Sequence, residues 1–373
     1  MWLLCFFLVA FVSTLVSAAN LRDSLGTAGI TAVFPGDPKY VDASTAFNLR
    51  FDFKPAVITY PTTPRDVSEI LKISSALNMK ASARGGGHSY IANGLGGMDG
   101  VIVLDMRSFS KVTANPSQGT ATIESGNRLG DIALALSKAG RGLPHGTCAY
   151  VGIGGHSSYG GYGFASRMWG LTLDTIQAVN MVLANGTTIT ASDKENSDLF
   201  WGMRGLGGSF GVTTSIEVKT FPAPPSATTF EYMWTLDVDA VARGFGAFEI
   251  SRSDWFVEVE LWGGSNSAVN AVPSDATAFA HRSSLLTIQF YASAPGMQPP
   301  FPDYGLTFLD NMVDSIISNS PTNWNYGAYP NYIDDRLPEW QTRYYGAHYP
   351  RLRALKDKYD PQDVFSFPTA VEE

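Results

Sequence analysis

The first part of the chain alternates between runs of β-forming residues and stretches with helical spacing. Ala56–Tyr60 is a short β-type run, and the Thr63-Pro64-x-Asp66 that follows is typical of a helix start with proline at its first position. Apolar residues then recur at helical spacing, at Val67, Ile70, Leu71 and Leu77. The pattern predicts a strand, a helix and a second strand that leads into a glycine-rich segment.

The same mixture of strands and helices continues to about Phe221. Alternating or β-branched runs predict strands at Val101–Leu104, Ala121–Glu124, Ile176–Leu183 and Val212–Val218, and a helix is expected at Leu129–Leu136. Asn185-Gly186 lies between two β-type runs and is a typical hairpin turn. With Thr187 it also forms an N-glycosylation acceptor, which suits an exposed turn. An α+β fold is therefore predicted.

Beyond about residue 225, strict alternation of apolar and polar residues replaces this mixture. In Phe256–Leu261 the side chains of Val257, Val259 and Leu261 face one way, whereas Glu258 and Glu260 face the other. Thr287–Tyr291 repeats the scheme, with Gln289 among the polar positions. Acids and amides on one sheet face suit the binding of a sugar. An ordinary solvated sheet face has the same pattern, so the pattern alone leaves both interpretations open.

Composition and charge narrow the class of protein. The chain has 373 residues, of which 45% are hydrophobic and 16% charged, which is ample for a large core and two domains. The formal charge of −8 argues against nucleic acid or a membrane surface as partner, and we expect a monomer. Met1–Ala19 is apolar from Trp2 to Val16, which indicates a signal peptide and a secreted, extracellular protein. A membrane anchor is the alternative, but the run is short for spanning.

The number of cysteines indicates that one of them has a function. The chain contains only Cys5 and Cys148, and Cys5 would leave with the signal peptide. The remaining thiol cannot form an internal disulfide, and an odd thiol in an oxidising compartment is a liability unless it is used. A buried inert cysteine is the alternative. One cysteine and scattered histidines provide no known ligand spacing, so no metal site is expected.

Three consecutive glycines precede a histidine in Ala83–Tyr90. Gly85–Gly87 leave successive backbone N–H groups uncovered, and such groups form a concavity for phosphate oxygens. His88 would then point at the molecule that carries the phosphates. Arg84–Tyr90 resembles the pyrophosphate loop of flavoproteins with a PCMH-type, or vanillyl-alcohol-oxidase-type, FAD domain. In the berberine-bridge-enzyme-like branch of these flavoproteins, the histidine at this position is bonded covalently to the flavin. The resemblance therefore implies that His88 carries the flavin here.

A second glycine-rich block extends from Leu143 to Asp174. Its closely spaced glycines let the backbone approach a flat ring system and are too irregular for a linker. The block resembles the second FAD-binding stretch of fungal glucooligosaccharide oxidases, which implies a second covalent bond between FAD and Cys148. The FAD-binding residues implied by both stretches are Arg84, Gly85, Gly86, Gly87, His88, Ser89, Cys148, Val151, Gly152, Gly154, Gly155, His156, Gly160, Gly161, Gly163 and Val212.

The same resemblance implies residues for catalysis and substrate binding. Glu260 lies just before Leu-x-Gly-Gly, where these oxidases carry an acidic residue that is usually aspartate. Tyr329–Tyr332 is similar to their Tyr-x-Asn-Tyr, whose second tyrosine is the proposed general base. His348 stands where asparagine is more usual. The implied catalytic residues are Tyr332 and Glu260, and the implied substrate-binding residues are Tyr90, Glu258, Gln289 and Tyr329.

The implied reaction oxidises the anomeric C1 hydroxyl of an oligosaccharide to a lactone, with FAD as cofactor and O2 reduced to H2O2. A phenol with a pKa of about 10 is a poor base at neutral pH. The charge of Glu260 beside Tyr332 would raise that pKa further, yet the carboxylate could accept the proton through a hydrogen bond.

Four segments follow from these assignments. They are a signal peptide (1–19), a PCMH-type FAD-binding domain (48–222), a smaller antiparallel-sheet substrate domain (226–328) and a C-terminal segment that returns to the FAD domain (329–373). Against usual family length, the chain lacks on the order of a hundred residues. Glu231–Trp255 joins sequences that resemble opposite ends of the missing piece. We therefore expect a truncated substrate domain with exposed apolar surface and weak activity.

Other classes of protein remain as alternatives. Gly207–Gly211 matches the G-x-S-x-G pattern of serine hydrolases, but that motif requires a following helix, and Val212–Val218 is strand-like. A non-catalytic secreted carbohydrate-binding protein would lack the yellow colour of a flavoenzyme. A berberine-bridge-type oxidase of secondary metabolism would prefer phenolic or alkaloid substrates to sugars.

Overall fold

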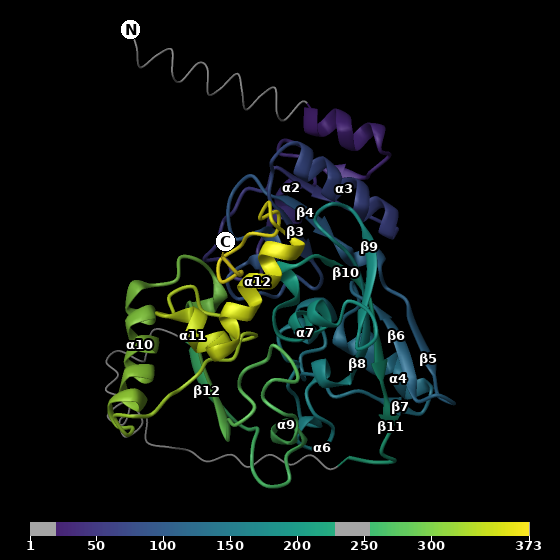
Figure 1. The fold of residues 1–373 in the computed structure, drawn as a ribbon. Helices are drawn as coiled ribbons and strands as arrows, with labels where there is room; N and C mark the ends of the chain where they lie inside the picture. Colours follow the sequence, from purple (N-terminus) through teal and green to yellow (C-terminus); the bar gives the residue numbers. More distant parts are fainter. Residues whose placement is uncertain (1–19, 228–253, 373) are drawn as a thin grey trace.

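The computed structural model describes residues 20–227 and 254–372. Most of Glu231–Trp255 and the expected signal peptide lie outside the described residues. In Figure 1, helix α10 (Asp303–Ser318) and strand β12 (Asp254–Leu261) lie on one side of the molecule. A five-stranded sheet lies on the other side, and the two sides are joined by the C-terminal helices.

The predicted strand, helix and strand near the start of the chain are confirmed. Helix α3 (Pro64–Ala76) begins with a capping box between Thr63 and Asp66, as its sequence favours. It connects two strands of a four-stranded sheet in which β2 and β3 run parallel to β4, so the segment that begins at Gly85 leaves the carboxyl edge of the sheet. The order of this sheet is β1 (Ala32–Val33), β2 (Val57–Thr59), β4 (Ile102–Asp105) and β3 (Ala81–Arg84).

The second sheet is antiparallel throughout and contains the predicted strands Ala121–Glu124, Ile176–Leu183 and Val212–Val218, whereas the predicted strand Val101–Leu104 is β4 of the first sheet. The Asn185-Gly186 turn joins β8 to β9, and Asn185 is exposed there, as the hairpin pattern predicts. The α+β prediction is thus confirmed. The order of this sheet is β5 (Val112–Asn115), β6 (Thr120–Glu124), β10 (Val212–Lys219), β8 (Ile176–Val182) and β9 (Thr188–Ser192).

The largest hydrophobic core joins this antiparallel sheet to distant parts of the chain. Phe200 of helix α7 (Ser197–Leu206) and Leu352 of helix α12 (Tyr349–Tyr359) both lie in it. Trp262, which follows β12, is 1% exposed in the same core. The pair of strands β12 and β13 is therefore anchored to the five-stranded sheet through one large buried side chain.

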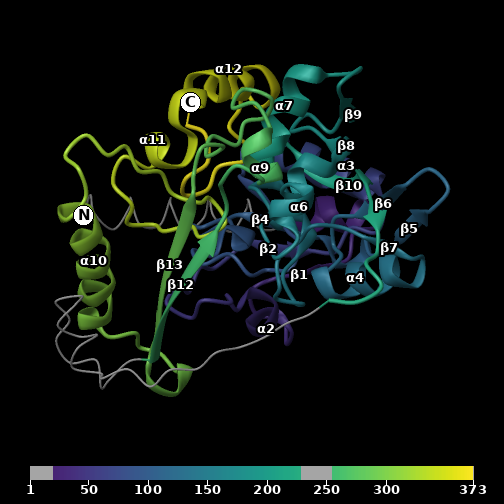
Figure 2. The ribbon, with the colours of Figure 1, turned by 90° about the horizontal axis from the view of Figure 1, so that it is seen from below.

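Strands β12 and β13 (Leu286–Ser293) form an antiparallel pair along their whole length (Figure 2). Their register sets Glu258 opposite Gln289 and Glu260 opposite Thr287. Opposed residues of an antiparallel pair point to the same face, so the predicted polar face exists.

The apolar face of this pair is only partly covered. Phe308 and Met312 of α10 pack against Trp255, Val257 and Phe290. Helix α10 has no counterpart among the helices predicted from the sequence. Farther along the same face, Val259 is 58%, Leu261 44% and Leu286 48% exposed. In the described part of the chain this agrees with the apolar exposure expected from a shortened substrate domain.

The C-terminal segment packs against the first sheet. The backbone N–H of Ala81 in β3 donates to the carbonyl of Val364 over 2.8 Å. Phe365 is 1% exposed in the core formed with that sheet. The buried Lys356 donates to the carbonyl of Phe365 at 2.9 Å and to the carboxylate of Asp360 at 2.7 Å, which fixes the segment after α12.

The remaining elements are short. They are β7 (Arg141–Gly142), β11 (Phe221–Pro222), α2 (Tyr40–Ser44), α4 (Leu129–Lys138), α5 (Ile153–Ser158), α6 (Ser166–Trp169), α9 (Ala268–Ala271), α11 (Trp340–Tyr345), 3-10 turns of three or four residues and a helix over residues 20–27. Pro222, the last residue of the predicted FAD-binding segment 48–222, pairs with Arg141 in the β11–β7 ladder. Among the residues described, no helix is long and apolar enough to cross a membrane.

Candidate active site

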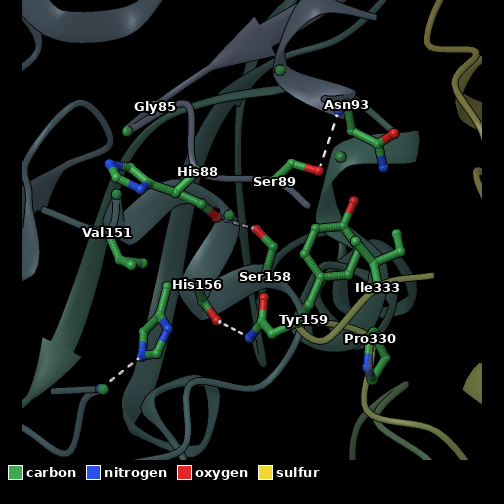
Figure 3. A pocket seen from close by; sticks show the side chains of 18 of the residues that line it. Gly85, His88, Ser89, Asn93, Val151, His156, Ser158, Tyr159, Pro330 and Ile333 are labelled. Atoms are coloured by element: carbon green, nitrogen blue, oxygen red, sulfur yellow. Dashed lines mark hydrogen bonds between the residues drawn. The ribbon is translucent and has the colours of Figure 1, made fainter. Parts of the chain in front are cut away.

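A cavity of about 330 Å³ lies where the first sheet, the second glycine block and the polar face of β12 and β13 meet. Figure 3 shows His88, Val151 and His156 along one side of it and Pro330 and Ile333 along the other. Both glycine-rich stretches and the Tyr329–Tyr332 segment thus contribute to one cavity. The predicted residues that line it are Gly85, Gly86, Gly87, His88, Ser89, Tyr90, Cys148, Val151, Gly152, Gly154, Gly155, His156, Gly163, Glu258, Glu260, Gln289, Tyr329 and Tyr332.

The two glycine stretches touch each other through their backbones at Gly86 and Gly152. A side-chain carbon added at either position would collide with the backbone nitrogen of the other. Only glycine allows this approach, and it leaves uncovered backbone from both stretches facing the cavity. A wall of bare backbone without long side chains fits a flat, phosphate-bearing group such as FAD.

His88 and Cys148 lie in the wall of the same cavity. The His88 ring packs at a tilt against Phe47, with 4.5 Å between the ring centroids. Burial lowers the pKa of His88, and the charge of Arg128 lowers it further. Cys148 is an exposed free thiol. The structure therefore does not support the alternative that Cys148 is a buried inert residue.

His156 is buried and holds the second glycine block. Its Nε2 accepts the backbone N–H of Gly146 at 3.1 Å, and its carbonyl accepts Nδ2 of Asn331 at 3.0 Å (Figure 3). Burial, with the charge of His145, lowers the pKa of His156 to about 3, so its imidazole is neutral. A neutral ring can accept from Gly146 on one nitrogen.

Four of the implied FAD-binding residues do not line the cavity. The side chain of Arg84 is buried. Its Nε donates to Oδ2 of Asp105 at 2.9 Å, and its Nη1 donates to the backbone carbonyl of Ala43. Val212 is buried in the core beside the first sheet. Gly160 and Gly161 contact Tyr329 and Thr172 instead. The side chain of Arg84 therefore stabilises the end of β3 and does not reach toward a ligand.

Tyr332 and Glu260 meet on the side of the cavity that strand β12 lines. The Tyr332 hydroxyl donates to Oε1 of Glu260 at 3.0 Å, and Trp262 Nε1 donates to Oε2 at 3.3 Å. Burial raises the pKa of Glu260, although both hydrogen bonds oppose this and the charge of Glu258 adds to it. Burial and the negative charge of Glu260 raise the pKa of Tyr332 well above its ordinary value. The phenol is therefore neutral and the carboxylate is its acceptor.

Tyr90 and Gln289 form a second polar pair beside the first. Nε2 of Gln289 donates to the Tyr90 hydroxyl at 2.9 Å and joins the loop after β3 to strand β13. Burial raises the pKa of Tyr90. Glu258 is exposed to the cavity next to this pair. The fold thus brings these three residues to the same cavity as Tyr332 and Glu260, the other residues that the family resemblance singled out there.

Tyr329 is fully engaged by protein groups. Its hydroxyl accepts the backbone N–H of Gly161 at 2.9 Å and of Tyr162 at 3.1 Å, and Nδ2 of Asn331 lies 2.9 Å away. Burial raises its pKa to about 12. With its oxygen occupied by three donors, Tyr329 is a residue that positions the second glycine block.

Several residues that line the cavity were missed by sequence reasoning. Gly207, Gly208, Gly211 and Thr213 line it from the segment that enters β10. Closely spaced glycines there could have indicated another backbone approach, but the match to a hydrolase motif obscured it. Ser209 is fully buried, and a strand follows it, so the hydrolase alternative is wrong. The described residues also contain no cluster of metal-ligating side chains.

Comparisons with known proteins agree with this site. The sequence matches the FAD binding domain family over residues 55–192 and the berberine and berberine-like family over residues 328–372. A glucooligosaccharide oxidase of Sarocladium strictum is 30% identical over 88% of this chain and 89% of its own. A xylooligosaccharide oxidase of Thermothelomyces thermophilus is 29% identical over 95% of this chain and 94% of its own.

The fold comparison gives the same result. The solved glucooligosaccharide oxidase of Acremonium strictum, which carries a 6-S-cysteinyl, 8α-N1-histidyl FAD, matches with a TM-score of 0.85 and 28% identity over 95% of this chain and 99% of that one. The alignment to the xylooligosaccharide oxidase spans 471 positions. Because this chain has 373 residues, about a hundred of those positions have no counterpart in it.

Fold, paired glycine stretches and sequence matches together define a FAD-linked oxidoreductase. More narrowly, the chain belongs to the berberine-bridge-enzyme-like family of FAD-linked oxidases, on the branch that includes the fungal oligosaccharide oxidases. It is a shortened member of that family.

Proposed function

We propose that this protein oxidises the anomeric C1 hydroxyl of oligosaccharides to the lactone and reduces O2 to H2O2. The observation that carries the proposal is the hydrogen bond between Tyr332 and Glu260 in a cavity that is also lined by both glycine stretches. Removal of a hydride from a carbinol carbon requires loss of the hydroxyl proton, and this pair provides a place for that proton.

FAD would be held by the uncovered backbone around Gly86 and Gly152, with covalent bonds to His88 and Cys148. Support comes from the position of both side chains in one cavity wall and from the doubly attached flavin of the Acremonium strictum relative. When bound, the flavin supplies the hydride acceptor for C1 and the electron donor for O2. The remaining chemistry belongs to the side chains of this chain.

Tyr332 and Glu260 would move the proton together. The C1 hydroxyl gives its proton to the oxygen of Tyr332 while the phenol proton passes to Glu260 along the existing hydrogen bond, whose oxygen–oxygen distance is 3.0 Å. No free phenolate is required, which matters because the pKa of Tyr332 is raised by burial and by Glu260. The raised pKa of Glu260 makes its carboxylate a stronger acceptor than an exposed glutamate.

Tyr90, Glu258 and Gln289 would orient the sugar. Gln289 retains its carbonyl and one amide hydrogen for a ligand after donating to Tyr90. Glu258 lies on the same face of β12 as Glu260. Acceptors and an amide side by side can read the hydroxyl pattern of a pyranose. Tyr329 acts through the glycine block and is not assigned to substrate.

A peroxide assay tests the proposal. Cello-, malto- and xylo-oligosaccharides should yield one H2O2 per lactone, whereas phenolic and alkaloid substrates should yield none. The reverse result would establish the berberine-bridge-type oxidase of secondary metabolism instead. Absence of yellow colour from purified protein would overturn both.

A second candidate, a flavin-binding protein with little activity, is favoured by two observations. Val259, Leu261 and Leu286 leave the back of the substrate sheet open to solvent, and about a hundred family positions are missing.

Secretion as a monomer is also part of the proposal, and the exposed Asn185 is accessible to glycosylation in that compartment.

A further inference from the structure

We propose that Glu258 makes the sugar site selective for cationic, amino-bearing oligosaccharides over neutral ones. The inference rests on the proposed function, which it deepens by naming the substrate class. It depends on one side chain whose charge has no partner within residues 20–227 and 254–372, and on a cavity that the same residues line without a lysine or an arginine.

Glu258 is the free carboxylate of the substrate face. Its neighbour Glu260 accepts from Tyr332 on one oxygen and from Trp262 on the other. Glu258 lines the cavity and is exposed to it, and the described part of the chain provides no hydrogen bond or ion pair to its carboxylate. A ligand therefore meets both of its oxygens unpaired.

The other groups that face the cavity do not neutralise this charge. Among the described residues that line it, none is a lysine or an arginine. The two histidines are His88, whose pKa is lowered by burial, and His156, whose pKa is lowered to about 3. Glu258 and Glu260 thus make the wall negative, and a bound FAD pyrophosphate would add to that sign.

The surroundings of Glu258 also fit a sugar nitrogen. In the register of the sheet it lies opposite Gln289, whose amide is fixed by its bond to Tyr90. A protonated amine on a pyranose ring can donate to the carboxylate while the adjacent hydroxyl pairs with the Gln289 carbonyl. A neutral sugar would leave the carboxylate with a weaker partner, and a uronic acid would be repelled.

Equilibrium binding to the holoprotein tests this inference. The two ligands are 1-deoxycellobiose and the 1-deoxy β-1,4-linked glucosamine disaccharide. Both lack the C1 hydroxyl, so neither can be oxidised. They differ only in that the second carries ammonium groups where the first carries hydroxyls. Perturbation of flavin absorbance gives each Kd. The amino disaccharide should bind at least about tenfold more tightly, equivalent to about 1.4 kcal/mol. High salt should reduce that ratio.

Two variants test whether the charge of Glu258 causes the preference for the amino disaccharide. Glu258→Gln keeps the shape and removes the charge, so the ratio of the two Kd values should fall to within about twofold. Glu217→Gln removes an exposed carboxylate of β10 that does not line the cavity, and should keep the wild-type ratio. Equal binding of both sugars by the wild type, or a preference that survives in Glu258→Gln, overturns the inference alone. Failure of both sugars to bind to the yellow protein overturns the proposed function as well.

Discussion

The hydroxyl of Tyr332 lies 3.0 Å from Oε1 of Glu260, and this contact joins the C-terminal segment to strand β12. The indole Nε1 of Trp262 donates a hydrogen bond to the other carboxylate oxygen, Oε2 of Glu260, at 3.3 Å. Because an ionised carboxylate has no proton to give, the phenol is the donor in this contact, and in the proposed mechanism its proton passes to Glu260.

Replacement of Tyr332 by phenylalanine should leave flavin bound and slow its reduction by sugar by about 10²-fold or more, the usual contribution of a general base. Anaerobic stopped-flow bleaching measures this step. Tyr326→Phe is a suitable control, because that tyrosine packs against Arg343 away from the cavity. An unchanged bleaching rate in Tyr332→Phe would assign the base to another residue.

The acid side of the pH profile should report Glu260. The carboxylate must be ionised to accept the proton, and its pKa is raised, so kcat should fall with decreasing pH at a higher pH than an ordinary glutamate would give. Glu260→Gln should abolish this limb and slow the reaction, whereas Glu260→Asp should retain it. A profile identical in wild type and Glu260→Gln contradicts the assignment.

The flavin should remain on the chain after precipitation with trichloroacetic acid. His88→Ala or Cys148→Ala should each leave one bond, and the double variant should release the cofactor. Flavin fluorescence of the denatured protein on a gel separates the four cases. Complete extraction from the wild type would show that neither bond forms.

Tyr329→Phe should destabilise the second glycine block. It removes the acceptor of the backbone N–H groups of Gly161 and Tyr162, and an unsatisfied buried donor costs about 1–3 kcal/mol. Urea denaturation should show a lower midpoint, together with lower flavin content. A wild-type midpoint with weakened sugar binding would return Tyr329 to the substrate site.

Turnover on oligosaccharides should be weak although the flavin-anchoring residues are present. The uncovered apolar stretch at Val259, Leu261 and Leu286 should bind a hydrophobic dye, and Val259→Thr with Leu286→Thr should reduce that binding. Soluble protein with family-like turnover and no dye binding would show that the shortened sheet is tolerated.

Sequence alone predicted those features that local patterns determine. The Thr63 helix start and the Asn185-Gly186 turn depend on a few adjacent residues, and both occur as expected. The alternation in β12 and β13 correctly placed Glu258, Glu260 and Gln289 on one face. The two glycine stretches were recognisable because close backbone approach excludes other residues.

The direction of individual side chains was harder to predict. Arg84 is adjacent to the glycines in sequence, but its guanidinium turns to Asp105, and nothing local specifies that partner. Tyr329 lies within a substrate-like motif, yet its hydroxyl is taken by backbone groups more than a hundred residues earlier in the chain. Helix α10 was missed, since only three of its residues, Gly305, Phe308 and Met312, are buried and its apolar face is correspondingly narrow.

The bond between Ala81 and Val364 has a consequence for how the protein is made. Strand β3 leaves the ribosome long before the segment that contains its backbone partner Val364 and the Phe365 side chain that packs into the same core. The first sheet is therefore completed only after that distant segment has also been synthesised. Nascent chains that stall or terminate early would expose that unfinished edge and be recognised by chaperones and proteases.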